Sequence, residues 1–267
     1  MGSKMKVDGK VFVVTGAGSG VGRQLTLELT QRGAQVAAVD VREEPLLETK
    51  ALAGLHVKIF VADVTDERAV QELPAKVVDH FGKVDGLINN AGIIQKFVSI
   101  SELNMDDARH VMAVNFTGPL LMIKSFLPHL VKRPQGHIVN VSSMGAYAPV
   151  PGQSIYGASK AAIAQLTDGL RSELLDTPVD VTLVFPGAMN TNIAANSGIE
   201  MSMERSVARK IKTLEPAKAA RLMVDAIESG KDRIFVGQDA KMMNVLSRLS
   251  PKLAAALIYR QMKNLLS

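Results

Sequence analysis

Short apolar runs alternate with segments of helical length along this chain, and this alternation constrains its fold most. Seven runs have the length and composition of strands: 11–14, 36–39, 57–61, 86–88, 137–141, 179–185 and, more weakly, 233–236. Between them lie amphipathic segments with helical periodicity: 22–32, 45–53, 67–81, 105–131, 155–175 and 216–229. Strands that are apolar on both faces are typical of parallel sheets covered by helices. The sequence therefore predicts an α/β fold with a doubly wound, seven-stranded parallel sheet flanked by helices on both faces.

The chain reads as one domain, 1–267, because it shows no repeat and no linker, and 47% of its 267 residues are hydrophobic. Segment 188–210 departs from the alternation and is expected to be a substrate lid. No run approaches the roughly 18 apolar residues of a membrane-spanning helix. The absence of cysteine excludes disulfides and thiolate catalysis and fits a cytoplasmic location. The five histidines lack metal-ligand spacing, so no catalytic metal is expected.

Positive charge is concentrated at the C-terminal end. The chain carries a net charge of +5, and residues 241–267 contain five basic residues and no acidic one. Segment 240–267 is expected to form a basic amphipathic helical tail, with Ser250-Pro251 at the start of its second helix. Nucleic-acid binding is disfavoured because the tail lacks interleaved aromatic and basic residues. Packing against a sister subunit or over the substrate pocket is favoured over peripheral membrane contact through 241–267.

A glycine-rich segment, Thr-Gly-Ala-Gly-Ser-Gly-Val-Gly at 15–22, follows the first predicted strand and opens the first helix. In this position glycines let the backbone approach a pyrophosphate, and the helix N-terminus offers unpaired N–H groups. The spacing departs from the usual G-x-G-x-x-G pattern. The segment nevertheless predicts a Rossmann-like dinucleotide site with these candidate residues: Gly16, Ser19, Gly20, Val21 and Gly22.

Asp40 ends the second predicted strand, roughly 20 residues beyond the glycines. At this spacing a carboxylate accepts hydrogen bonds from an adenosine ribose. Because a carboxylate repels a 2′-phosphate, NAD is favoured over NADP as the cofactor, although Arg42 two positions later keeps NADP open. Asp63 and Val64, after the third predicted strand, are candidates for contact with the adenine.

Tyr156 and Lys160 are four residues apart in the predicted helix 155–175, so they share one face. A nearby cation favours phenolate, and we expect Lys160 to lower the pKa of Tyr156 from its ordinary value of about 10. A tyrosine poised in this way can give a proton to a carbonyl oxygen or take one from an alcohol.

Taken together, the segment 15–22, Asn-Asn-Ala-Gly at 89–92, Ser142-Ser143 and Tyr156-x-x-x-Lys160 resemble the short-chain dehydrogenase/reductase family over about residues 7–237. The resemblance implies that Tyr156 is the general acid/base and that Lys160 lowers its pKa and binds the nicotinamide ribose. It implies that Ser143, rather than Ser142, holds the substrate oxygen. It also implies that Asn115 helps to position the lysine through a water molecule.

The resemblance further implies cofactor contacts and an assembly. Asn89 to Gly92 would stabilise the central strand and line the cofactor ribose, with Asn90, Ala91 and Gly92 as the cofactor-binding residues. The segment 186–191 would bind the nicotinamide carboxamide through Pro186, Gly187, Met189 and Thr191. Helices around 115–131 and 155–175 usually form subunit interfaces in this family, so a homodimer or homotetramer is expected.

The expected function is NAD-dependent interconversion of a secondary alcohol and a ketone. Few fixed charges are expected to face inward from the apolar residues of segments 145–153 and 188–210, so a moderately sized, largely apolar substrate is expected. Open alternatives are an NADP-dependent carbonyl reductase, an enoyl reductase or dehydratase on the same fold, and a non-catalytic dinucleotide-sensing or membrane-recruited protein.

Overall fold

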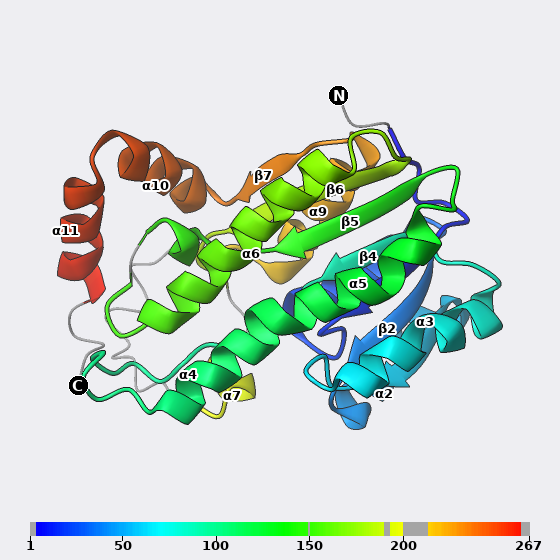
Figure 1. Ribbon diagram of the computed structural model, residues 1–267, viewed down its shortest axis with the longest axis horizontal. Coiled ribbons are helices and arrows are strands. Elements are labelled where there is room, and N and C mark those ends of the chain that lie inside the picture. The colour runs from blue at the N-terminus through cyan, green and yellow to red at the C-terminus, as the bar shows by residue number, and fades with distance from the viewer. Residues whose placement is uncertain (1–3, 149, 190–192, 200–212, 263–267) are drawn as a thin grey trace.

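The computed structural model describes residues 4–148, 150–189, 193–199 and 213–262. Within these ranges seven parallel strands form one sheet in the order β3-β2-β1-β4-β5-β6-β7 (Figure 1). The strands are β1 (Val11–Thr15), β2 (Gln35–Asp40), β3 (Val57–Val61), β4 (Gly86–Asn89), β5 (Gly136–Val141), β6 (Val179–Pro186) and β7 (Arg233–Val236). The prediction of a doubly wound parallel sheet is confirmed.

Helices cover both faces of the sheet. They are α1 (Gly20–Gln31), α2 (Glu43–Ala53), α3 (Glu67–Phe81), α4 (Met105–Met112), α5 (Gly118–Leu130), α6 (Ser154–Glu173), α7 (Ile193–Asn196), α9 (Pro216–Glu228), α10 (Gln238–Leu249) and α11 (Pro251–Met262). Side chains of α1, α2 and α9 pack into one core layer, and those of α3, α5 and α6 pack into the other. Figure 1 shows α5 and α6 in front of the sheet and α9 behind it.

Strand β1 shows why its sequence forms a central strand. All five of its residues are buried. Phe12 and Val14 belong to the layer with α1, and Val11 and Val13 belong to the layer with α5. Successive side chains of a strand point to opposite faces, so an unbroken apolar run supplies both layers at once.

The segment predicted as one helix over 105–131 is interrupted by a π-helical turn, Ala113–Thr117. The turn carries Asn115, which is buried. The Asn115 side chain accepts a hydrogen bond from the Ile93 amide (2.9 Å) and donates to the Ile93 carbonyl (2.9 Å) and to Ser159 Oγ (3.0 Å). The π turn therefore brings one polar side chain of an apolar helix to the carboxyl end of β4, as such turns often do at functional sites.

By length and composition alone, the continuous helical stretch Met105–Leu130 could cross a membrane. Its inner face, however, is part of the protein core, because Met122, Phe126 and Leu130 are fully buried there. Such burial is typical of a helix packed on a sheet.

The tail consists of α10 and α11, and α11 begins at Pro251 as the sequence predicts. Both helices pack on the turn after β5. Ala148 joins Met243, Ala254 and Ile258 in one apolar cluster, and the Tyr147 hydroxyl donates to the Ala240 carbonyl (2.8 Å). The tail therefore packs against the segment after β5 of its own chain. Residues 263–267 of the predicted tail lie outside the described residues.

Candidate active site

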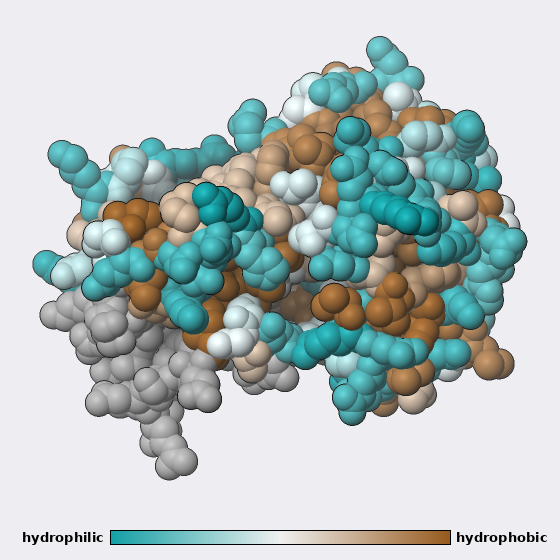
Figure 2. All heavy atoms as spheres, turned by 60° about the horizontal axis from the view of Figure 1, so that its bottom comes forward, coloured by the Kyte–Doolittle hydropathy of each residue, from teal (hydrophilic) through white to brown (hydrophobic). Residues whose placement is uncertain are grey.

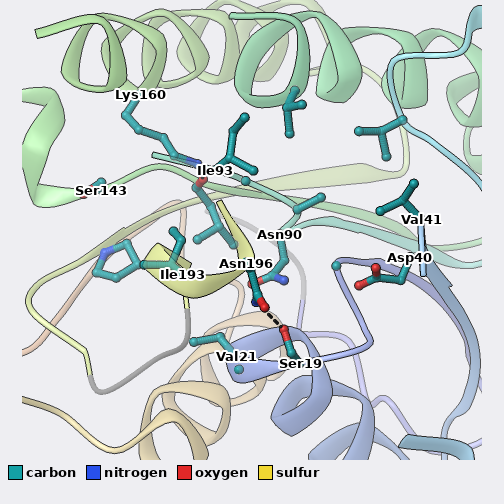
Figure 3. A pocket seen from close by; sticks show the side chains of 18 of the residues that line it. Ser19, Val21, Asp40, Val41, Asn90, Ile93, Ser143, Lys160, Ile193 and Asn196 are labelled. Carbon is teal, nitrogen blue, oxygen red and sulfur yellow. Dashed lines mark hydrogen bonds between the residues drawn. The ribbon is translucent and has the colours of Figure 1, made fainter. Parts of the chain in front are cut away.

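A cleft of about 510 Å³ opens at the carboxyl ends of the strands. It extends from Asp40 and Val41 at one end to Ser143 and Lys160 at the other, with Ile193 and Asn196 of α7 crossing it (Figure 3). Figure 2, which brings the lower edge of Figure 1 forward, shows apolar side chains around a hollow near the middle of that face. The carboxyl ends of strands are where open α/β sheets bind ligands.

The glycine-rich turn forms the floor of the cleft between β1 and α1. Gly16 has a φ of 67°, a conformation that favours glycine. A Cβ on Gly22 would collide with the Gly16 carbonyl oxygen, so α1 can approach β1 only if this residue is glycine. Gly16, Ser19, Gly20 and Val21 line the cleft, whereas Gly22 lies behind it and has a packing role.

Asp40 is held in place at the adenosine end predicted from the sequence. Its Oδ2 accepts a hydrogen bond from the Gly18 amide (3.0 Å), and its Oδ1 accepts one from the Arg42 amide (3.1 Å). Asp63 and Val64 also line the cleft. The Asp63 carboxylate accepts from the amide and hydroxyl of Thr65, both at 2.8 Å, which fixes the turn after β3.

The segment after β4 is fixed to the end of β1. Thr15 Oγ1 accepts from the amides of Asn90 and Ala91, both at 3.0 Å, and the Asn90 side chain donates to the Thr15 carbonyl (2.9 Å). A Cβ on Gly92 would lie 3.1 Å from Lys160 Nζ and 3.2 Å from Asn115 Oδ1. Glycine at position 92 therefore leaves room for the lysine beside the cleft.

Tyr156, Ser143 and Lys160 meet at the other end of the cleft. The Lys160 ammonium lies 6.0 Å from the centre of the Tyr156 ring and donates to the Val141 carbonyl (3.0 Å). Burial lowers the pKa of Lys160 to about 8. Ser143 Oγ accepts from the Gly145 amide (3.0 Å), whereas the neighbouring Ser142 donates to the Lys160 carbonyl (2.6 Å) and supports the helix.

The expected lowering of the Tyr156 pKa is not found. Burial has the largest effect and raises the pKa of the phenol, while a hydrogen bond with Ser143 opposes the rise. Desolvation disfavours the charged phenolate, and Lys160 directs its ammonium to a backbone carbonyl. The prediction considered the cation but not the burial of the hydroxyl.

Asn115 does not line the cleft. Its hydrogen bonds to Ile93 and Ser159 place it behind Lys160, between the β4 loop and α6. This position fits a supporting residue that does not touch the substrate.

At the end of β6, Pro186, Gly187 and Met189 line the cleft. Asp239 of α10 fixes this turn, because its carboxylate accepts from the Ala188 amide (2.6 Å). Thr191 and residues 200–210 of the predicted lid lie outside the described residues. The described part of segment 188–210 includes α7, whose Ile193 and Asn196 line the cleft.

The sequence interpretation did not identify four residues in or beside the cleft: Ile93, Gln95, His110 and Asn196. Asn196 accepts from Arg42 Nη2 (3.0 Å) and donates to Ser19 Oγ (2.9 Å), so it spans the adenosine end (Figure 3). The exposed His110 lies at the rim. No local spacing marks Gln95 or Asn196, since their hydrogen-bond partners are distant in the chain.

The cleft fits a nicotinamide dinucleotide. The glycine-rich turn, which packs closely against the start of α1, provides backbone N–H donors of the kind that bind a pyrophosphate. The carboxylate of Asp40 ends β2, where a ribose would be bound. Tyr156 and Lys160 lie beyond them, at the end where the nicotinamide would react.

Comparisons with known proteins agree with this geometry. The family model of the short chain dehydrogenases matches residues 10–201. SadH of Mycobacterium tuberculosis, named as an oxidoreductase, is 38% identical over 252 residues and 91% of each chain.

Two solved structures extend the comparison. A short-chain dehydrogenase/reductase from Burkholderia phymatum in complex with NAD aligns with a TM-score of 0.85 at 27% identity over 94% of this chain and 97% of that one. A short-chain dehydrogenase from Burkholderia cenocepacia in complex with NADP aligns with a TM-score of 0.81 at 29% identity over 95% and 99%. The chain therefore belongs to the short-chain dehydrogenase family of oxidoreductases.

Proposed function

We propose that this protein is an NAD-dependent oxidoreductase that interconverts a secondary alcohol and a ketone, with Tyr156 as the general acid/base. The observation that carries the proposal is the meeting of Tyr156, Ser143 and Lys160 at one end of a cleft whose other end presents Asp40. Isolated members of this set are common in proteins. Their convergence in one cleft is what reaction at a carbonyl carbon requires.

The residues at the reacting end have complementary tasks. A bound nicotinamide supplies or accepts the hydride. Reduction of a ketone builds negative charge on its oxygen, and the Ser143 hydroxyl is available to stabilise that charge. Tyr156 gives its proton to the same oxygen, so the alcohol forms; in oxidation Tyr156 takes the proton back. The positive charge of Lys160, 6.0 Å from the centre of the Tyr156 ring, would stabilise the phenolate that remains after proton transfer.

The raised pKa of Tyr156 favours ketone reduction at neutral pH. A phenol whose pKa lies above its ordinary value stays protonated and is ready to donate. Oxidation needs the deprotonated phenol, so its rate is expected to rise with pH.

The surroundings of Asp40 support NAD rather than NADP. Among the described residues that line this end, Asp40 presents a carboxylate that would repel a 2′-phosphate. Arg42 donates to Asn196 (3.0 Å), and Arg23 forms an ion pair with Glu48 (2.6 Å). An NADP-dependent carbonyl reductase would bind the 2′-phosphate with a cation, and Arg42, whose bond to a neutral amide leaves its charge, keeps this alternative open.

The apolar lining supports a largely apolar substrate of moderate size. Ile93, Val114, Met189 and Ile193 line the cleft, and Met144 packs beside Ser143 in the cluster with the tail helices. An apolar pocket with a few convergent polar groups is typical of small-molecule sites.

A spectrophotometric screen tests the proposal. NADH absorbance is followed with ketones and secondary alcohols that include steroids, cyclic alcohols, acyl chains and sugars, and each reaction is repeated with NADPH. Turnover of an apolar ketone with NADH is expected. Turnover only of carbon–carbon double bonds would indicate an enoyl reductase. Firm NAD binding without turnover of any compound would indicate a non-catalytic sensor.

We also propose a homodimer or homotetramer in the cytoplasm. The assembly is supported by membership of a family that is typically oligomeric, and the location by the absence of cysteine. Light scattering coupled to size-exclusion chromatography tests the assembly, and a monomer at micromolar concentration would contradict it. Cell fractionation tests the location.

A further inference from the structure

The outer face of α10 carries an apolar stripe. Met242, Val245 and Leu249 are 57%, 55% and 81% exposed, and their spacing places them on one side of the helix. Ala240 and Met243 on the opposite side are buried. The inner side of α10 is covered by the protein, whereas the apolar outer side is exposed to solvent in this chain.

Cations flank this stripe. Lys241, Arg248 and Lys252 are exposed, and none of the ion pairs found among the described residues involves them. No acidic residue occurs after Asp239, whose carboxylate turns inward to the Ala188 amide. The outer face therefore combines apolar side chains with uncompensated positive charge.

We propose that this face of α10 and the start of α11 binds the surface of an anionic phospholipid membrane. Apolar side chains would enter the interface, and lysine and arginine would meet lipid phosphates. A second copy of this chain is a poorer partner, because a two-fold interface would place the same cations of both copies together.

Vesicle co-sedimentation tests this surface, with vesicles of phosphatidylcholine alone and vesicles in which a third of the lipid is phosphatidylglycerol. The triple variant Lys241→Gln, Arg248→Gln, Lys252→Gln should bind the anionic vesicles on the order of a hundred-fold more weakly, since each cation contributes roughly five-fold. The matched control is the triple variant Lys50→Gln, Lys58→Gln, Lys231→Gln, which changes exposed lysines elsewhere and should bind like the unmodified protein.

Leu249→Ser should also weaken binding, whereas Leu175→Ser, at another exposed leucine, should not. Absence of binding to anionic vesicles would overturn the proposal, as would equal losses in the two triple variants. If Leu249→Ser instead dissociates the protein into smaller species in light scattering, the stripe is a subunit interface and the proposal is wrong.

Gln95, in the loop after β4, is a buried polar residue that is 2% exposed. Its Oε1 accepts from the backbone amides of Ile155 (2.8 Å) and Tyr156 (3.1 Å). In return, the Gln153 side chain donates to the Gln95 carbonyl (2.6 Å). The first turn of α6 is therefore capped by a residue 60 positions away. Gln153, at the N-cap position of α6, makes no side-chain hydrogen bond to the amides of this turn.

We infer that Gln95 is a positioning residue for Tyr156, an inference that rests on the proposed role of that tyrosine. The β4 loop also supplies Gly92 and Ile93 to the cleft, so the cap ties the phenol to the same segment that lines the coenzyme site. Displacement of a reacting group by about 1 Å can reduce turnover about a hundred-fold. Loss of the cap should therefore affect turnover more than coenzyme binding.

Gln95→Met keeps the length of the side chain and removes the acceptor, and we expect kcat to fall at least ten-fold with KM and the coenzyme Kd within two-fold. Gln95→Glu keeps an acceptor and should restore most of kcat, with the pH profile shifted because a charge is added. A kcat within two-fold of the unmodified protein in Gln95→Met, or a loss shared equally by Gln95→Glu, would overturn the inference. If Tyr156→Phe is itself active, the proposed function fails instead.

Discussion

The carboxylate of Asp40 accepts a hydrogen bond from the amide of Gly18 at 3.0 Å, which joins the end of β2 to the glycine-rich turn after β1. A Cβ on Gly18 would lie 2.9 Å from the same carboxylate oxygen. One contact thus links the two parts of the predicted dinucleotide site and fixes the orientation of the group that would select the coenzyme.

Replacing Asp40 with alanine should relax the coenzyme preference. Removal of the carboxylate removes both the ribose acceptor and the repulsion of a 2′-phosphate, so the ratio of kcat/KM for NADH to that for NADPH should fall at least about ten-fold. Steady-state rates with both coenzymes measure this ratio. Glu44→Ala, at an exposed carboxylate in the first turn of α2, is the control. An unchanged ratio in Asp40→Ala would contradict the ribose role.

Tyr156→Phe should lower kcat by about 10²–10⁴-fold, the usual contribution of general acid–base catalysis. Coenzyme affinity should change little, because the ring remains. Fluorescence titration of NADH and stopped-flow rates separate the two quantities. Activity within a factor of ten of the unmodified protein would show that another group transfers the proton.

Asn196→Ala should speed coenzyme release. The Asn196 side chain links Ser19 to Arg42 across the adenosine end of the cleft, and the loss of about 1 kcal/mol of hydrogen bonding corresponds to roughly five-fold in rate. Stopped-flow displacement of NADH measures the dissociation rate. Asn244→Ala, in α10, is the control and should release NADH at the unmodified rate. Equal rates in the two variants would mean that α7 does not retain the coenzyme.

His137 should make the protein less stable in acid. Burial lowers the pKa of His137 from 6.5 to about 4, and the Thr182 hydroxyl (2.9 Å from Nε2) accepts from the neutral ring because it donates to the Lys231 carbonyl. Below pH 6.5 the unfolded chain binds a proton that the folded chain does not take up until about pH 4. The free energy of unfolding should therefore fall by about 3 kcal/mol as the pH falls from 6.5 to 4.

Urea denaturation of the unmodified protein and of His137→Gln between pH 4 and 7 tests this origin. The variant is expected to lose less stability over that window, because the remaining carboxylates titrate alike in both proteins. If both proteins lose the same amount, the acid sensitivity arises elsewhere.

The order of the elements could be predicted from the sequence because the signal is local. A strand buried on both faces requires an apolar run, and the runs 11–14 and 36–39 are typical of strands in a covered parallel sheet. The glycine-rich turn, Asp40 and the pair Tyr156 and Lys160 were identified for the same reason, since their spacing along the chain carries their geometry.

Other features depend on contacts between distant segments. Gln95 lies 60 positions from Ile155, and Asn196 lies 177 from Ser19, so no spacing predicts either contact. The π turn at Asn115 arises where one helix meets both the β4 loop and α6. The pKa of Tyr156 also depends on tertiary structure, because desolvation by the packed surroundings outweighs the charge of a neighbour on the same helix. The sequence by itself determined the order of the strands and helices and the positions of the glycine-rich turn, Asp40, Tyr156 and Lys160, whereas only packing decided which further groups join them, how deeply they are buried and what holds them in place.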